Sequence, residues 1–356
     1  MATALVGGVL AAKVGNGGNA WTRISLVRGL ARLGFDVVFL EQLPGATAEQ
    51  TRYFDDVCRA FDIEGYLLDG NAPAQSGAEL LVNIGGHLTD RSLRDAARVR
   101  VFLDDDPGYT QLWHAQGLLA DKLPCHDFHF TFGANIGRSD CPIPTDGIAW
   151  RPTRPAVVLD DWPFSDDGDP NRFTTVASWR GAYGRVEQNG HLFGQKAHEF
   201  RKLASLPRQS TQRFEIALEI APEDAGDLEL LRSGGWSIVD PSVASDPEGF
   251  RSYVQGSGAE FSVAQGVYVE TRSGWFSDRS VRYLASGKPV LVQDTGLAER
   301  LPTGEGLLVF RTAEEALSRA EAISEDYERH ARGARAIAEE YFDSDRVLGE
   351  LCEQVL

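Results

Sequence analysis

The chain has 356 residues, more than one hydrophobic core usually holds, so two domains of ordinary size are expected. Its composition is typical of a soluble globular protein, and its formal net charge of -17 argues against nucleic acid as a partner, because a phosphate backbone requires a basic surface. The four cysteines form no C-x-x-C pair, which favours reduced thiols in a cytoplasm over a disulfide framework or a zinc site. No run of the sequence approaches the roughly 18 apolar residues of a membrane span, so no membrane-spanning segment is expected.

The first 40 residues predict the start of an open α/β sheet. A strand (4–10), a glycine-rich loop, a helix and a second strand (35–40) follow one another. Such a unit makes its two strands parallel and places the loop at the carboxyl edge of the sheet, where open α/β sheets bind ligands. Gly17 and Gly18 in this loop would let the backbone approach a bound molecule closely, because they have no side chain.

The same loop has a second interpretation. Its run from Gly15, G-N-G-G-N-A, places Ala20 where the dinucleotide fingerprint G-x-G-x-x-G has its third glycine. Glu41 follows the second strand, where a ribose-binding acid would lie. An NAD-dependent dehydrogenase centred on this loop is therefore an alternative function.

Three further apolar runs, at 79–84, 99–103 and 128–132, each end in polar residues. Parallel strands would gather these residues at one edge of the sheet. Three aspartates follow the second run, and successive side chains of an extended chain point in opposite directions, so at most Asp104 and Asp106 face the same way. A divalent metal bound by these two carboxylates is one interpretation.

A proline-rich and acidic segment, 141–170, predicts the boundary between the two domains, because it resists regular helix and suits an interdomain crossing. We expect an N-terminal domain at 1–150, a linker at 151–172 and a second domain at 173–340. A C-terminal helix at 341–356 completes the chain, and packing back on the N-terminal domain is one expectation for it.

The stretch TRSGWFSDRSVRYLASGKPVLVQDTG, which begins at Thr271, predicts a turn, a short helix capped by Ser277, a stop at Gly287 and a strand. The N–H groups of the helix's first turn, at Asp278, Arg279 and Ser280, would form a seat for an anion, since unpaired donors and the positive end of the helix dipole point the same way. Arg279 would add a fixed charge. The alternative is an ordinary unit with a capped surface helix.

The run WFSDRSVRYLASGKPVLVQDTG resembles the donor-binding segment of GT-B-type glycosyltransferases, and within group 1 it is most similar to the spore-maturation-protein-like branch. The resemblance is strongest over residues 173–310. It implies an α/β fold of two Rossmann-like domains facing across a cleft, and transfer of a sugar from a nucleotide-diphosphate sugar to a small or medium acceptor such as a glycan, lipid or natural product. Retaining relatives place two glutamates where this chain has Gly274 and Arg282, so a retaining or inverting outcome stays open, and Asp278 is a candidate for sugar or ribose recognition.

The resemblance also implies roles for single residues. Arg180 and Lys196 fall where relatives grip the donor's diphosphate, which gains negative charge as the glycosidic bond breaks and is stabilised by nearby cations. Asp240 falls where relatives lay the nucleobase against the backbone, and the glycine turn after the first strand touches donor or acceptor. Asp106 falls where relatives have a cleft histidine, so it is a candidate base, with His87 as the other candidate.

Since GT-B enzymes generally need no bound metal, the resemblance implies a metal-independent, hexosyltransferase-like enzyme. We expect no cofactor, a nucleotide sugar as co-substrate and a cytoplasmic location. A nucleotide-sugar 2-epimerase of the same fold, which would convert the sugar without an acceptor, is a further alternative. The sugar, the base, the acceptor and the oligomeric state stay open.

Overall fold

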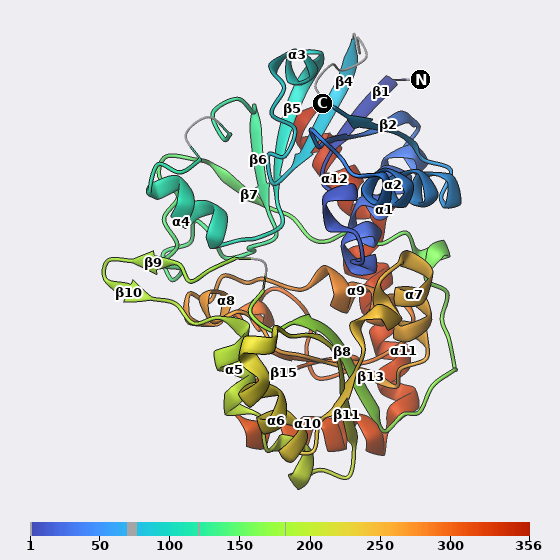
Figure 1. The fold of residues 1–356 in the computed structure, drawn as a ribbon, viewed down its shortest axis with the longest axis vertical. Helices are drawn as coiled ribbons and strands as arrows, with labels where there is room; N and C mark the ends of the chain where they lie inside the picture. The colour runs from blue at the N-terminus through green and yellow to red at the C-terminus, as the bar shows by residue number, and fades with distance from the viewer. Residues whose placement is uncertain (1, 70–76, 120–121, 182) are drawn as a thin grey trace. The chain divides into compact units, whose positions relative to one another are not determined.

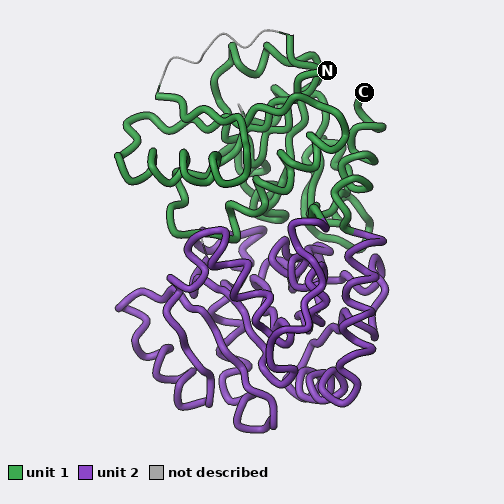
Figure 2. The backbone as a smooth tube through the Cα atoms, turned by 90° about the vertical axis from the view of Figure 1, so that its right-hand side faces the viewer, with its two compact units in different colours: residues 1–158, 342–356 green, residues 159–341 purple. Residues whose placement is uncertain are grey.

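A computed structural model describes residues 2–69, 77–119, 122–181 and 183–356. The chain divides into two compact units (Figure 2). Unit 1 comprises Met1–Val158 and Phe342–Leu356, and unit 2 comprises Leu159–Tyr341, so the chain leaves the first unit within the proline-rich segment and returns to it at its end. Each unit is built on a parallel sheet with helices, which confirms the predicted α/β class.

The sheet of unit 1 has the order β3-β2-β1-β4-β5-β6-β7, and every pair in it is parallel. Its strands are β1 (Ala2–Gly7), β2 (Phe35–Gln42), β3 (Glu64–Leu68), β4 (Ala78–Ile84), β5 (Ala97–Asp104), β6 (Phe128–Thr131) and β7 (Trp150–Pro152). Strand order reverses between β1 and β4, so connections leave this point in opposite directions. Such a switch point is where open α/β sheets bind ligands, outside the carboxyl ends of the strands.

The helices of unit 1 are α1 (Gly17–Arg32), α2 (Ala48–Ala60), α3 (Arg91–Asp95), α4 (Tyr109–Ala115) and α12 (Ser344–Val355). The helix α12 packs on α1 (Figure 1). The contact is close at Gly29, where an added Cβ would lie 2.5 Å from Leu348 Cδ1 and 2.9 Å from Ser344 Cβ. Arg32 of α1 donates through Nε and Nη2 to the carboxylate of Asp345, at 2.7 and 2.9 Å. The end of the chain therefore completes the first unit.

The sheet of unit 2 has the order β12-β11-β8-β13-β14-β15, again with parallel pairs only. Its strands are β8 (Arg172–Ser178), β11 (Arg213–Glu219), β12 (Ser237–Val239), β13 (Ala259–Ser262), β14 (Val290–Gln293) and β15 (Leu307–Phe310). Numbered within the unit, this order is 3-2-1-4-5-6, the Rossmann order, and the switch point lies between β8 and β13.

The helices of unit 2 are α5 (Lys196–Lys202), α6 (Ala225–Ser233), α7 (Pro247–Gln255), α8 (Gly266–Glu270), α9 (Asp278–Ala285), α10 (Ala313–Glu325) and α11 (Tyr327–Ile337). One core joins the sheet to α5, α6 and α10, through Phe200, Leu231 and Ala320 among others, while α7, α9 and α11 pack together elsewhere in the unit (Figure 1). None of the helices in the described residues has the length and the apolar composition needed to cross a membrane.

Candidate functional site

The switch point of unit 2 brings together three connections. The loop after β8 contains Gly181, the loop after β13 contains Gln265, and Lys196 begins α5. The backbone N–H of Lys196 donates to Gln265 Oε1 at 2.6 Å. Gly181 has a φ of 77°, and a Cβ there would lie 2.2 Å from Gln265 Nε2, so the loop after β8 can approach this close only as glycine. The three connections therefore form one continuous edge.

The helix α9 has the capped start and the glycine stop that its sequence predicts. Ser277 has an extended backbone, and its Oγ accepts the N–H of Arg279 at 3.2 Å. Val281 and Leu284 are fully buried, and Gly287, with a φ of 70°, directs the chain toward β14. Local capping chemistry thus sets where this helix begins and ends.

A narrow pocket of about 10 Å³, room for about one water molecule, lies at the start of α9. It is lined by Ser262, Ala264, Trp275, Phe276, Ser277, Ser280, Val292, Gln293 and Leu297. Ser280 is completely buried, and among the described residues its hydroxyl has no hydrogen-bond partner. Buried polar groups in native proteins are almost always paired, so this hydroxyl indicates a position for a water or for a polar ligand atom.

Arg279 turns toward the sheet. Its Nε donates to Glu260 Oε1 at 2.6 Å, its Nη1 to the carbonyl of Val176 at 3.0 Å, and its Nη2 to Ser262 Oγ at 2.8 Å. Glu260 is fully buried. The guanidinium charge that the sequence suggested for an anion is therefore offset by a carboxylate, and the side chain fastens α9 to β8 and β13.

Arg180 also has a carboxylate partner. Its Nε and Nη2 donate to the two oxygens of Asp224, at 2.7 and 2.6 Å, and Asp224 is buried while Arg180 is exposed. The hydrogen bond from Arg180 lowers the pKa of Asp224. A positive residue does follow β8, but its charge is largely offset within unit 2.

Asp240 and Asp278 complete the predicted donor residues. Asp240 follows β12, the edge strand two positions from β8, and its carboxylate accepts the N–H of Ser242 at 2.8 Å. Hydrogen bonds from the side chain of Ser242 and from its backbone N–H lower the pKa of Asp240. Asp278 opens α9 beside Ser277. The structure therefore groups Arg180, Lys196 and the start of α9 around the centre of the sheet, and places Asp240 at its margin.

In unit 1, the carboxyl ends of β4 and β5 carry His87 and Asp105 on one side of Gly85. A Cβ on Gly85 would lie 3.0 Å from His87 Nε2 and 3.7 Å from Asp105 Oδ1. Arg23 of α1 donates to Asp105 Oδ2 at 3.3 Å. Burial, with the positive charges of Arg23, Lys122 and Lys13, lowers the pKa of His87 to about 4, so its imidazole is neutral at pH 7.

Asp104 is fully buried at the end of β5 and accepts three side-chain hydrogen bonds, from Thr110, Gln111 and Thr131, at 2.6 to 2.7 Å. Burial raises its pKa to about 6. Asp106 is half-buried, and its N–H donates to Asp104 Oδ1 at 3.2 Å. The two carboxylates that the sequence suggested as metal ligands thus lie in different environments. Asp104 is buried and accepts hydrogen bonds within the turn, and Asp106 lies nearer the surface.

The glycine loop has a different architecture from the one the dinucleotide fingerprint requires. Gly17 and Gly18 form the first turn of α1, which Asn16 caps by accepting the N–H of Asn19. Glu41 is buried and accepts the N–H groups of Leu10, Ala11 and Ala12, at 2.6 to 2.8 Å. Glu41 holds the loop, so the acid that supported an NAD alternative has a structural role.

Sequence reasoning missed Arg23. It lies one turn before Val27 on the apolar face of α1, where a buried cation is unusual, and that position is the signal that could have found it. The side chain is 8% exposed and forms an ion pair with Asp105, which follows β5.

No protein-family model matches the chain. A 124-residue segment is 27% identical to phosphoribosylamine–glycine ligase of Halalkalibacterium halodurans, a match that covers 35% of this chain and 28% of that enzyme.

Solved structures match over nearly the whole chain. Anabaena Alr3699/HepE in complex with UDP and glucose is 13% identical, with 99% of each chain covered and a TM-score of 0.60. The complex of the same protein with UDP-glucose gives the same values. AviGT4, a glycosyltransferase involved in Avilamycin A biosynthesis, is 12% identical over 99% of this chain and 97% of that one, with a TM-score of 0.59. These likenesses confirm the predicted fold: the chain has two Rossmann-like units in the GT-B arrangement of elements.

Proposed function

We propose that the protein is a glycosyltransferase that takes a sugar from a nucleotide-diphosphate sugar. The observation that carries this proposal is the edge of unit 2, where the switch point of a Rossmann-ordered sheet meets a pocket with the unpaired hydroxyl of Ser280. The structural neighbour HepE, which has the same fold, binds UDP and UDP-glucose. Fold and pocket together support a nucleotide sugar as the substrate of this chain.

The donor's diphosphate is proposed to lie at this edge. The first-turn N–H groups of α9, from Asp278 onward, and the positive end of its dipole favour an anion beside Ser277. Lys196 begins α5 on the other side of Gln265 and adds a cation. Negative charge grows on the diphosphate as the glycosidic bond breaks, and fixed donors stabilise it without reorganising.

Catalysis is proposed to use unit 1. Asp106 is the candidate base, because it is half-buried whereas Asp104 is fully buried, and His87 is the second candidate because its imidazole is neutral at pH 7. We propose that transfer needs no divalent metal, since cationic side chains and a helix N-terminus can supply the positive charge. The four free cysteines suit a cytoplasmic site of action.

Thermal-shift measurements with UDP, GDP, dTDP and NAD test the proposal. A ligand at 100 times its dissociation constant stabilises a protein by about 2.7 kcal/mol, which is readily seen as a higher melting temperature. We expect a nucleoside diphosphate to raise the melting temperature and NAD to leave it unchanged. A rise with NAD alone would overturn the proposal in favour of a dehydrogenase.

The 2-epimerase alternative is separated by following a nucleotide sugar by NMR. A transferase without an acceptor leaves the sugar unchanged or hydrolyses it slowly, whereas an epimerase inverts the configuration at C2. Appearance of the C2 epimer without any acceptor would contradict glycosyl transfer as the main activity.

A further inference from the structure

The connection between β1 and α1 carries a lysine on an ordered loop. It contains the short helix η1 (Ala11–Lys13), whose first N–H groups donate to the carboxylate of Glu41. The side-chain amide of Asn19, in the first turn of α1, donates to the carbonyl of Val9 at 2.9 Å. Lys13 therefore extends from a fixed loop at the carboxyl edge of the sheet, just ahead of the positive end of the dipole of α1.

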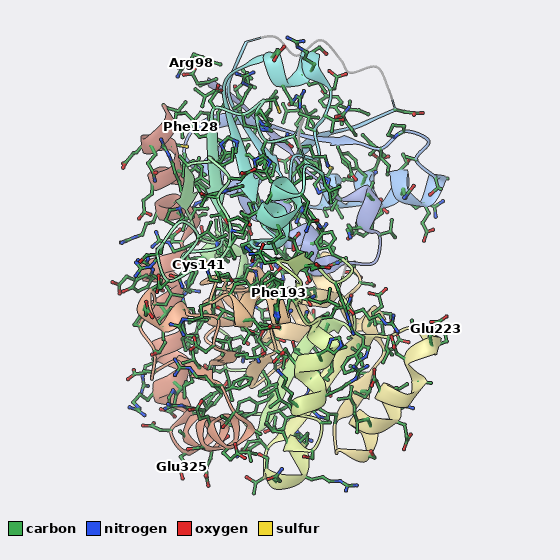
Figure 3. The ribbon with its side chains drawn as sticks, turned by 90° about the vertical axis from the view of Figure 1, so that its left-hand side faces the viewer. Arg98, Phe128, Cys141, Phe193, Glu223 and Glu325 are labelled. Atoms are coloured by element: carbon green, nitrogen blue, oxygen red, sulfur yellow. The ribbon has the colours of Figure 1, made fainter. Side chains whose placement is uncertain are left out.

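A second lysine reaches this edge from the segment before β6, the strand that begins at Phe128, labelled in Figure 3. The chain after β4 passes through Gly85 and Gly86, both with positive φ. A Cβ on Gly86 would lie 3.5 Å from the Cβ of Lys122. Since His87 follows directly, the backbone that carries Lys122 packs against the turn that carries this imidazole.

His87 is the group on which these positive charges converge. Beside burial, the charges that lower the pKa of its imidazole are those of Arg23, Lys122 and Lys13, all of them cations. The sequence has only five lysines and a net charge of -17, and two of the five lie within electrostatic reach of this one ring. Among the residues that the structure describes, the ring has no hydrogen-bond partner.

The two lysines differ from Arg23 in having no counter-charge. Arg23 pairs with Asp105 at 3.3 Å, and Glu41, which lies near Arg23 as well, is occupied by the N–H groups of the loop. Within the described part of the chain, Lys13 and Lys122 form no ion pair. Positive charge that gathers at one place without a carboxylate partner attracts an anion, and in a strongly acidic protein such a place stands out.

We propose that the acceptor of the sugar carries an oxyanion of the phosphate monoester type, and that Lys13 and Lys122 bind it beside His87. The inference rests on the proposed function, because it assigns the anion to the second substrate of a transferase whose donor is proposed to bind unit 2. A phosphate monoester has a charge of about −1.5 to −2 at pH 7, which two lysines complement. The neutral imidazole can donate its N–H to a phosphate oxygen.

The neighbouring residues take separate roles in this arrangement. Arg23 is a positioning residue, because its guanidinium occupies the carboxylate of Asp105, which would otherwise compete with the anion for the lysines. His87 becomes a binding residue, which leaves Asp106 as the candidate base. The sugar-accepting hydroxyl and the anion then belong to the same molecule, and the anion sets which molecules are accepted.

Inorganic phosphate is the probe, and NMR of the labelled histidine rings follows its binding to the full-length protein at neutral pH. The His87 signal is the one that is lost in His87→Gln. We expect this signal to move with added phosphate until it saturates. Lys13→Ala and Lys122→Ala should each weaken phosphate binding by about 10- to 100-fold, the range for losing one charge-assisted hydrogen bond, and change UDP binding less than about 2-fold.

Lys202→Ala is the matched control, because Lys202 is an exposed lysine of unit 2 that pairs with Glu199. Its phosphate response at His87 should equal that of the wild type. A His87 signal that ignores phosphate, or that responds equally in both lysine variants and the wild type, would overturn the inference and leave the proposed function standing.

UDP separates the two possible sources of the anion. We expect the His87 signal to respond to phosphate equally with and without saturating UDP. Displacement of phosphate by UDP would overturn the inference, because the anion would then belong to the donor. Failure of UDP to bind the wild type would overturn the proposed function, and with it the assignment of the anion to an acceptor, whatever the response of His87 to phosphate.

Discussion

Asp104 and Asp106, which are separated by a single residue, have different roles. Asp104 is enclosed by three side-chain donors, while Asp106 contributes its N–H to the turn and is only half-buried. If Asp106 is the base, Asp106→Asn should bind UDP as tightly as the wild type and lose at least about 100-fold in kcat, the usual contribution of general-base catalysis. Steady-state rates and UDP titration on the same preparation check this. Unchanged turnover with a lower melting temperature would make Asp106 a residue of the turn only.

The buried side chain of His126 should make the free energy of unfolding depend on pH in the acid range. It is 6% exposed, and its Nε2 lies 3.0 Å from the Asn83 side-chain nitrogen. Burial, followed by the charge of His129, lowers its pKa to about 4 from 6.5. A lowered histidine pKa contributes stability that is present above pH 6.5 and is lost as the pH falls toward 4, on the order of 3 kcal/mol in total.

Chemical unfolding between pH 8 and pH 4 measures this loss. The free energy of unfolding should fall more steeply with acid in the wild type than in His126→Gln, whose side chain does not titrate. Parallel curves for the two proteins would show that His126 is equally easy to protonate in the folded and unfolded chain.

At the scale of elements, the buried pair of Arg279 and Glu260 decides how α9 lies on the sheet. Arg279→Ala would leave the carboxylate of Glu260 buried without its partner, which typically costs about 3–5 kcal/mol. Arg279→Met combined with Glu260→Gln removes both charges and should recover a large part of that loss. Urea unfolding of the single and double variants checks the coupling, and strictly additive effects would contradict it.

The same element shows which features are readable from sequence. The start of α9 at Ser277 and its stop at Gly287 could be predicted, because capping and a left-handed glycine are properties of neighbouring residues. The direction of Arg279 could not, since its partner Glu260 lies on another strand, 19 residues away in the chain. Arg180 and Glu41 repeat this pattern. Their places along the chain could be predicted, but the groups that pair with their side chains come from distant segments of the sequence.

At the scale of the molecule, unit 2 is one continuous segment with its own sheet and core, whereas unit 1 is assembled from two segments. We expect residues 159–341, expressed alone, to unfold cooperatively and to bind UDP with an affinity within about 3-fold of the full chain, because the residues proposed to bind the diphosphate all belong to it. Circular dichroism melting and calorimetric titration test this. A non-cooperative melt would show that unit 2 depends on the rest of the chain.

The return of the chain to unit 1 has a consequence for synthesis on the ribosome. Residues 342–356 emerge after unit 2, yet α12 covers the face of α1 around Gly29. While unit 2 is being translated, that face of the first unit is still exposed to water and to other nascent chains. The later-made unit can therefore reach its native state first, reversing the usual order in which the N-terminal domain folds ahead of the rest.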